Sequence, residues 1–545
     1  MSTLLFPGRH LVNTRFQAEY LQGILGREPG KIPALQAGVT VPKDRLDRVI
    51  FAITSSNQDN SRYNPIPFHV RAIGVDRFAR ELQRTVAFTY RIVGIPHYGH
   101  TANFAAFTLK EIVAQTEHDE TLRPDNTVVL CSTPEVASLY VQLGFAVAPA
   151  EHVALAPKPA VPIEIIRAIG AGSGRWEDLA VVQSDLSPAT RSLFADSPEI
   201  PRRITRIYRD PLTNHEGSLT EKRNYNTYAR GMNGTIRNKY QDIREAIRPG
   251  RIVDEGCADG ALLVEIARDF PDSDLFGIDL SAEFAARFHE RKRSGEFGNV
   301  YTCFYLRNLL DPIFEPESVD TTICNSTLHE LWSYAEQEKT VRGYLAQKYA
   351  QLQPGGRLIV RDVVGPENGD TMVVLRCRAD DGEERAPADV PPSRPAELLK
   401  TLSTRSRFRL FLEDFLRDLR TSGRRTMETC VACRETPEGF ELPLRSAAEF
   451  LSKKDYTDNW CSEMNEEFCF WSYSRWKEGL REVGFNILEE GAQGKSASRV
   501  YANPWIVDNR YRNQARLFAA GTGQQIEYPP TNMVLVAEKP LRGNA

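Results

Sequence analysis

The sequence contains no apolar run of about 18 residues, the length that a membrane-spanning helix needs. Its first residues, MSTLLFPGRHLVNTRF, also lack the basic segment and long apolar core that are typical of a secretory signal peptide. We therefore expect neither a membrane helix nor a signal peptide, and no membrane partner.

The sequence also has few cysteines and no excess of positive charge. The chain has nine cysteines, an odd and scattered set, and several of them fall in apolar runs where they act as small buried residues. This pattern is typical of a reducing compartment and predicts a cytoplasmic protein. The formal net charge of -4 gives no sign of a nucleic-acid partner, although a local basic patch stays an open alternative.

The length favours two domains, because 545 residues exceed what one hydrophobic core usually supports. Short apolar strands alternate with amphipathic helices in both parts of the chain, which is the pattern of a parallel sheet covered on both faces. We predict an α/β fold with two Rossmann-like domains, residues 1–210 and 211–545. A charged, proline-containing insertion is expected at about 366–450.

The stretch VDEGCADG, residues 253–260, follows the first strand of the second predicted domain. Gly256 and Gly260 allow backbone torsions and a close ligand approach that a side chain would block, and the next helix directs its free N–H groups at the turn. About 20 residues later Asp279 ends the second strand, where a carboxylate can accept both hydroxyls of a ribose. Turn and acid together indicate an adenosine-type ligand.

The order of motifs resembles that of class I S-adenosylmethionine-dependent methyltransferases: D-x-G-C-x-x-G at the turn, Asp279, then RNLLD (307–311), NSTLHEL and LQPGGRLIVRD. Ala258 departs from the glycine that is common there, and a nicotinamide-binding dehydrogenase is disfavoured because G-x-G-x-x-G is not present. The resemblance implies a seven-stranded sheet and S-adenosylmethionine as cofactor. It implies these cofactor-binding residues: Asp254, Glu255, Gly256, Cys257, Gly260, Asp279, Leu280, Asn308, Leu309 and Asn325.

His329 and Glu330 are the candidate catalytic residues. Small-molecule O-methyltransferases with a related LHDW-like sequence use the matching histidine to deprotonate the acceptor hydroxyl, so the resemblance implies a base at His329. The alternative is that His329 only caps a helix or packs beside the cofactor. Glu330 would orient the imidazole or bind substrate.

The segment 455–476 combines six aromatic residues, from Trp460 to Trp476, with Glu463, Glu466 and Glu467. It is either a lid over a flat or cationic acceptor or, more commonly for such a helix, part of the core. Cys430 and Cys433 form a lone C-x-x-C, for which Zn²⁺ would need two more ligands, such as Cys461 and Cys469. We expect no metal.

The first predicted domain resembles nicotinamide-mononucleotide adenylyltransferase-like nucleotidyltransferases in strand order and local sequence. The family's phosphate-binding histidine motif is replaced here by GRHLVNTRFQ, in which Thr14 stands for the first histidine and Gln17 for the last. Arg167 is kept without the usual preceding Ser or Thr. HYGHT (97–101) follows the third strand, where it would line a pocket or form a loop. We interpret this domain as a nucleotide-fold module with degenerate catalytic motifs.

These observations predict a two-domain methyltransferase that acts on an oxygen or nitrogen of a small-molecule or nucleotide-like acceptor, which the first domain helps to recognise. Two alternatives stay open: a bifunctional nucleotidyltransferase and methyltransferase, and an RNA-binding assembly protein suggested by the basic stretches RRITRIYR and RTSGRR. A homodimer is also open.

Overall fold

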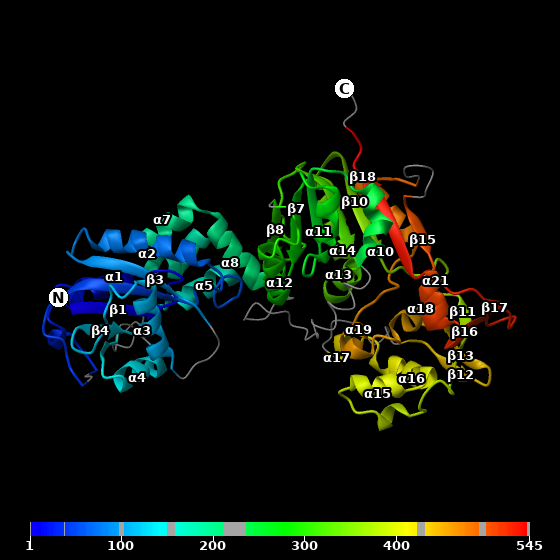
Figure 1. Ribbon diagram of the computed structural model, residues 1–545, viewed down its shortest axis with the longest axis horizontal. Coiled ribbons are helices and arrows are strands. Elements are labelled where there is room, and N and C mark those ends of the chain that lie inside the picture. Colours follow the sequence, from blue (N-terminus) through cyan, green and yellow to red (C-terminus); the bar gives the residue numbers. More distant parts are fainter. Residues whose placement is uncertain are drawn as a thin grey trace. The chain divides into compact units, whose positions relative to one another are not determined.

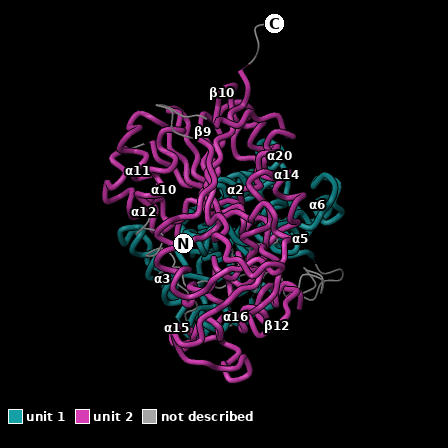
Figure 2. Tube along the Cα trace, turned by 90° about the vertical axis from the view of Figure 1, so that its right-hand side faces the viewer, with its two compact units in different colours: residues 1–218 teal, residues 219–545 magenta. Residues whose placement is uncertain are grey.

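The computed structural model describes residues 2–36, 39–97, 103–131, 133–149, 159–210, 236–299, 301–421, 431–489 and 497–541. Cys430, and all of the HYGHT motif except His97, lie outside these ranges, as do most of the polar stretch 213–240 and most of the RTSGRR run. The chain divides into two compact units, Met1–Ser218 and Leu219–Ala545 (Figures 1 and 2). Each unit is described by itself below.

The first unit is built on a parallel five-stranded sheet in the order β3-β2-β1-β4-β5. Its central strands are almost fully buried because helices cover both faces: α1 and α2 pack on one face, and α3 and α4 on the other. The strands are β1 (Ser2–Gly8), β2 (Leu46–Thr54), β3 (Thr89–Ile95), β4 (Thr127–Leu130) and β5 (Ala146–Ala148), and these four helices are α1 (Arg15–Ile24), α2 (Phe68–Leu82), α3 (Phe104–Gln115) and α4 (Pro134–Gln142).

A helical layer follows the sheet in this unit. Ile165, Ile166 and Ile169 pack against Phe194 and Ile204 in one apolar cluster. The helices are α5 (Pro162–Ala171), α6 (Ala180–Asp185), α7 (Pro188–Asp196) and α8 (Glu199–Arg209). β5 lies at the edge of the sheet, where its Ala146, Val147 and Ala148 side chains are buried beside β4.

Two residues of the altered histidine motif have structural partners. Thr14 is the N-cap of α1, and its side chain accepts a hydrogen bond from the Gln17 backbone N–H, while the Gln17 side chain accepts one from the Thr14 N–H. This reciprocal pair is a capping box that satisfies two N–H groups of the helix end. Both residues are buried, so neither side chain is free to bind a phosphate in this arrangement.

A buried polar cluster lies where β1 and β2 end. The Arg71 guanidinium donates hydrogen bonds to the backbone carbonyls of Arg9, Thr54 and Ser55. The His10 ring lies 3.0 Å from the Phe6 carbonyl through Nε2 and packs edge-on against the Phe6 ring. Burial lowers the pKa of His10 to about 4, with a further contribution from the positive charge of Arg71.

The second unit contains a sheet in the order β14-β18-β10-β9-β6-β7-β8, with β15 paired to β18 as well. β6 to β10 are parallel, and the last strand, β18, is antiparallel to β10. The strands are β6 (Arg251–Glu255), β7 (Asp274–Asp279), β8 (Thr302–Leu306), β9 (Val319–Asn325), β10 (Leu352–Asp362), β14 (Asn486–Ile487), β15 (Arg499–Tyr501) and β18 (Asn532–Glu538).

Helices cover both faces of this sheet. α10 (Ile236–Ile243), α11 (Ala261–Asp269) and α12 (Ala282–Arg293) pack on one face. α13 (Leu328–Tyr334), α14 (Gln337–Gln351) and α20 (Tyr473–Val483) pack on the other. Successive residues of a strand point to opposite faces. Asp254 therefore points towards α10, and Glu255 points towards α14.

The insertion is larger than the predicted 366–450. It forms an antiparallel sheet, β12-β13-β11-β16-β17, whose last two strands come from residues 515–526, and a single apolar core joins both segments. We call this part the inserted subdomain. It contains β11 (Met372–Cys377), β12 (Arg434–Thr436), β13 (Gly439–Pro443), β16 (Ala515–Ala519), β17 (Gln525–Ile526), α15 (Ala396–Thr401), α16 (Thr404–Asp414), α17 (Arg417–Thr421), α18 (Leu444–Lys453), α19 (Trp460–Glu463) and α21 (Pro504–Ile506).

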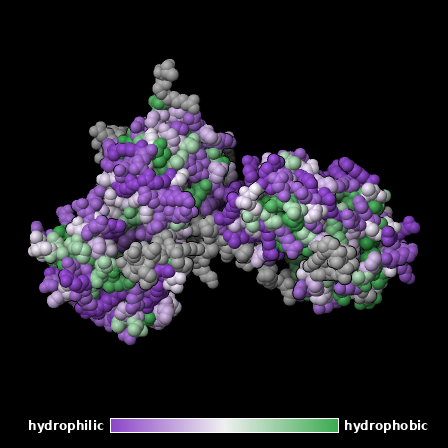
Figure 3. Space-filling view, turned by 180° about the vertical axis from the view of Figure 1, so that it is seen from behind, coloured by the Kyte–Doolittle hydropathy of each residue, from purple (hydrophilic) through white to green (hydrophobic). Residues whose placement is uncertain are grey.

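The aromatic segment 455–476 belongs largely to the core. Trp460 is 1% exposed and packs in the inserted subdomain, and Trp476 is 0% exposed and packs against the main sheet. Burial of these large side chains stabilises the fold, so the tryptophans are unavailable as a lid. On the face shown in Figure 3, hydrophobic residues form small patches among hydrophilic ones. Within the described ranges, no helix combines the length and apolar character needed to cross a bilayer.

We expect His10 to make the first unit sensitive to acid. A histidine whose folded-state pKa is depressed contributes stability above its unfolded pKa of 6.5, and this stability is lost as the pH falls towards 4. The shift corresponds to about 3 kcal/mol in total. Scanning calorimetry between pH 7 and 4.5 should show a flatter pH dependence in His10→Gln than in the wild type. His69→Gln, at an exposed position, is the control; equal slopes in all three proteins would contradict the assignment.

Candidate active site in the second unit

The bend after β6 is held by backbone hydrogen bonds to the neighbouring strand. The N–H groups of Gly256 and Cys257 both donate to the Ile278 carbonyl, at 2.9 and 3.1 Å. Gly256 and Gly260 have φ of 73° and 81°, torsions that favour glycine, and Ala258 adopts φ 48°. The bend therefore keeps a left-handed path at the carboxyl edge of the sheet.

Close internal packing accounts for the two glycines. A Cβ on Gly256 would overlap the Thr327 side chain, and one on Gly260 would lie 2.5 Å from the Phe288 ring. The expectation that these positions are bare to admit a ligand is therefore incomplete, because protein side chains already occupy the space next to each Cα. A ligand at this bend would meet backbone groups and the side chains that end β6, β7 and β9.

Asp279 closes the bend from the end of β7. Its Oδ2 accepts a hydrogen bond from Ala258 N at 3.0 Å, and its Oδ1 accepts one from Ser281 N at 2.8 Å. Burial raises the pKa of Asp279 to about 6; the backbone N–H donors oppose this rise and the Glu330 carboxylate adds to it. Each oxygen keeps a lone pair for a further donor.

Asp254 and Lys239 lie behind the bend on the α10 side. Asp254 is 2% exposed, and burial, with the nearby Asp279 and Glu255 charges, raises its pKa to about 8. Burial, with the Arg361 charge, lowers the pKa of Lys239 to about 8, and Lys239 Nζ lies 3.5 Å from Ser326 Oγ. Two ionisable side chains are thus kept in a weakly solvated space beside the ends of β6 and β9.

Two predicted cofactor-binding side chains have other roles. The Glu255 carboxylate is 1% exposed and accepts hydrogen bonds from the Lys348 ammonium and the Tyr344 hydroxyl, both at 2.5 Å. The Cys257 thiol packs where a Cβ on Gly277 would be. Both side chains therefore contact the interior of the unit, and cofactor binding by Glu255 and Cys257 stays a prediction.

The other predicted residues end neighbouring strands. The Asn308 side chain accepts a hydrogen bond from Leu310 N at 3.0 Å and shapes the RNLLD loop, which is joined to the end of β7 by Arg307 N and Asp279 O at 3.0 Å. Leu309 is 7% exposed in this loop. Leu280 follows Asp279, and Asn325 is the last residue of β9. These residues share the carboxyl edge of the sheet, where ligands of such sheets bind.

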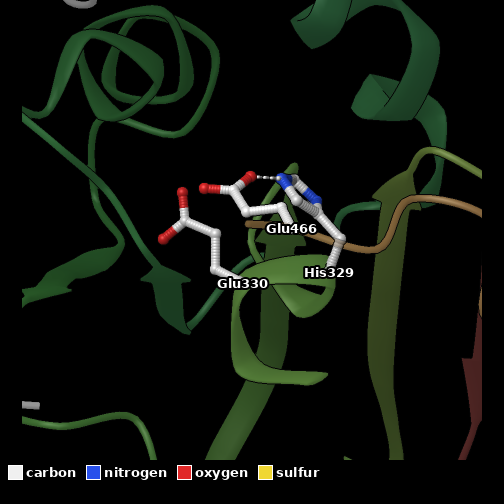
Figure 4. A group of neighbouring side chains, drawn as sticks. All are labelled: His329, Glu330 and Glu466. Atoms are coloured by element: carbon white, nitrogen blue, oxygen red, sulfur yellow. Dashed lines mark ion pairs between the residues drawn. The ribbon is translucent and has the colours of Figure 1, made fainter. Parts of the chain in front are cut away.

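His329 is held between the carboxylates of Asp362 and Glu466. Its Nδ1 lies 2.7 Å from Asp362 Oδ1. Its Nε2 lies 3.4 Å from Glu466 Oε2, the pair that Figure 4 marks with a dashed line. Burial lowers the pKa of His329, but Asp362 and Glu466 outweigh burial and raise it well above its usual range. The imidazole then carries a proton on both nitrogens near neutral pH. A protonated imidazole is not a general base, so this state does not support that role.

Glu466 reaches the site from the inserted subdomain. Its Oε1 accepts a hydrogen bond from the Tyr334 hydroxyl at 3.2 Å, and its backbone carbonyl accepts one from the buried Lys453 ammonium. Glu467 next to it accepts a hydrogen bond from Trp332 Nε1 at 3.0 Å. These contacts fix the loop against α13.

The sequence interpretation missed Asp362, Lys239 and Lys348 as contributors. Asp362 ends β10 in the LIVRD run, and an acid at the carboxyl end of a parallel strand, as at Asp279, is the signal that could have identified it. Nothing local distinguishes Lys239 or Lys348 from other helix lysines. Their burial and their carboxylate neighbours arise only in the folded chain.

Residues 253–358 match the family model described as a methyltransferase domain. This range runs from β6 into β10 and includes the bend, Asp279 and His329, although it is less than half of the chain. The matched region, similar to a methyltransferase domain, lies within the second unit. No curated protein sequence matches the chain.

Solved structures with a similar arrangement were also found. A candidate O-methyltransferase of Nostoc punctiforme is 12% identical over 58% of this chain and 60% of its own, with a TM-score of 0.29. A methyltransferase of Thermotoga maritima is 13% identical over 58% of this chain and 95% of its own, with a TM-score of 0.27. The methyltransferase SibL is 13% identical over 64% of this chain and 61% of its own, with a TM-score of 0.27. The chain thus spans about three fifths of the Nostoc protein and of SibL.

We expect the Glu255 and Lys348 pair to be sensitive to loss of one partner. Lys348→Met leaves an unpaired buried carboxylate and should lower the free energy of unfolding by about 3–5 kcal/mol. The double variant Glu255→Gln and Lys348→Met should recover part of this loss. Urea denaturation measures both, with the surface change Lys339→Met as control, and a Lys348→Met protein as stable as the control would contradict the assignment.

Proposed function

We infer that the second unit transfers a methyl group from S-adenosylmethionine to an oxygen or nitrogen of a small-molecule or nucleotide-like acceptor. One observation carries this proposal: Asp279 is fixed by the Ala258 and Ser281 N–H groups at the edge of the bend, within the matched methyltransferase domain. A carboxylate held in this way has lone pairs left for a diol. The backbone of the bend after β6 would form one side of the cofactor-binding site.

The residues that would hold the cofactor all end strands of one sheet. Asp279 would accept the ribose hydroxyls, and Asn308 with Leu309 would contact the adenine. Gly256 and Gly260 would keep the bend open to the methionine part through their backbone. The buried Asp254 and Lys239 offer one acceptor and one donor near the ends of β6 and β9 for the amino and carboxylate groups of that part.

Methyl transfer needs the acceptor atom in line with the sulfonium, and a base only where the acceptor loses a proton. The acceptor atom attacks the methyl carbon, the carbon–sulfur bond breaks, and the electron pair stays on sulfur. His329 is protonated between its carboxylates, so Glu330 or Glu466 would take the proton. Glu330 is half-buried and close enough to Asp279 to affect its pKa.

The first unit would assist acceptor recognition. Arg9 stands at the end of β1, 5.3 Å from the centre of the Tyr63 ring, and burial with the nearby Arg167 charge lowers its pKa. A guanidinium group at a strand end favours anionic ligands. Nucleotidyl transfer at this unit is the second candidate function, but Thr14 and Gln17, which stand where the family has phosphate-binding histidines, cap α1 instead. Pyrophosphate release from nucleoside triphosphates with Mg²⁺ would support it.

RNA binding has weaker support from the basic helix α8. Arg203 donates hydrogen bonds to the Pro65 and Asp59 carbonyls, and Arg209 donates one to the Gly172 carbonyl. These arginines satisfy backbone groups of their own unit. A steep salt dependence of RNA binding would be needed to restore this alternative.

The cofactor assignment is tested by Asp279→Asn. Loss of the charged acceptor should weaken S-adenosylmethionine binding about 10- to 100-fold, the range expected for hydrogen bonds to a charged group. Isothermal titration measures the affinity, and Asp274→Asn, at the exposed start of the same strand, is the matched control. If Asp279→Asn folds normally and binds as tightly as the control, the ribose assignment is wrong.

A further inference from the structure

Three side chains converge beside the proposed cofactor site: His329 and Glu330 of α13, and Glu466 of the inserted subdomain (Figure 4). One nitrogen or oxygen of each lies within 4.8 Å of the others. His329 is 6% exposed and Glu466 is 1% exposed, while Glu330 is half-buried. The proposed methyl transfer uses these groups only as proton carriers, which does not explain why a histidine and two carboxylates meet in one buried place.

The surroundings hold two of these side chains in the orientation of metal ligands. Asp362 contacts His329 Nδ1 at 2.7 Å, so that Nε2 points towards the two glutamates. Metal-binding histidines commonly contact a carboxylate through the other ring nitrogen in this way. The Tyr334 hydroxyl likewise contacts Glu466 Oε1 and leaves Oε2 directed at His329. Asp362 and Tyr334 therefore occupy the positions of an outer shell.

The spacing also fits an ion. The Nε2 to Oε2 distance of 3.4 Å is longer than a good N–H···O hydrogen bond. Two ligand atoms that are each about 2.1 Å from a tetrahedral ion lie about 3.4 Å apart. Glu330 has to move inwards by a small amount, which its partial exposure allows.

The local charge favours a cation. Asp362, Glu330 and Glu466 lie around one imidazole, and Lys453, which donates to the Glu466 backbone carbonyl, forms an ion pair with Glu449 at 2.8 Å. A divalent ion would balance the carboxylates and replace the proton on Nε2. One nitrogen and two carboxylate oxygens suit first-row divalent ions such as Mn²⁺ and Zn²⁺.

We propose that His329, Glu330 and Glu466 bind a divalent first-row metal ion, with Asp362 orienting the histidine. Three protein ligands leave at least one position open, as in catalytic rather than structural sites. If the proposed function holds, this position would take the acceptor oxygen, which a bound metal makes easier to deprotonate. The acceptor would then be an oxygen compound able to bind a metal.

The test uses Mn²⁺ with the full-length chain after treatment with a chelator. Mn²⁺ is preferred to Zn²⁺ as probe because it favours oxygen and nitrogen ligands, and the chain has exposed thiols at Cys303 and Cys461. Electron paramagnetic resonance of free Mn²⁺ should show one bound ion per chain. Glu466→Gln should weaken binding at least tenfold, and Glu330→Gln should do the same at a half-exposed position where folding is less at risk.

Glu467→Gln is the matched control, because Glu467 is next to Glu466 but contacts Trp332 and Gln337. It should keep the wild-type affinity for Mn²⁺. The absence of bound Mn²⁺ in the wild type, or equal affinity in Glu330→Gln and the control, would overturn the metal site. S-adenosylmethionine titration of the same proteins separates the two proposals: cofactor binding without Mn²⁺ binding removes only the metal site, and the reverse result removes only the methyltransferase assignment.

Discussion

The hydrogen bonds between the bend after β6 and the end of β7 are the constraint on which the proposed site depends. The Ile278 carbonyl accepts hydrogen bonds from the Gly256 and Cys257 N–H groups, and the Asp279 carboxylate accepts one from the Ala258 N–H. Together they fix a left-handed path that only small residues tolerate, with Thr327 and Phe288 packed against its glycines. The carboxylate that would contact a ribose is also the group that closes the bend, so its position and the shape of the bend are determined together.

Asp254 and Glu255 are adjacent in β6 but lie on opposite faces of the sheet, because successive residues of a strand point in opposite directions. Asp254 points to the α10 side and stays near Lys239, whereas Glu255 points to the α14 side and is neutralised by Lys348. Removing either the carboxylate or the ammonium of a buried ion pair lowers the free energy of unfolding, because the remaining charge has no partner. One acid is therefore available for chemistry at the strand ends, and the other anchors a helix to the sheet.

The inserted subdomain completes the site from a distant part of the chain. Its core of Phe408, Phe411 and Phe450 positions α18, and Lys453 of that helix binds the Glu466 carbonyl. The loop then meets α13 through Glu467 and Trp332. The inserted subdomain thus supplies Glu466, a second carboxylate partner of His329 beside Asp362 of the main sheet.

Local pattern alone predicted the alternation of strands and helices in both units, the bend after β6, and Asp279 at the end of β7, because apolar periodicity and glycine torsions are properties of neighbouring residues. It did not predict the antiparallel sheet of the inserted subdomain, since β11 pairs with β16 across more than a hundred residues. The same limit applies to Glu255, whose lysine partner is 93 residues away, and to His329, whose charge depends on Asp362 and Glu466. Burial and the meeting of distant charges set these roles, and both exist only once the chain has folded.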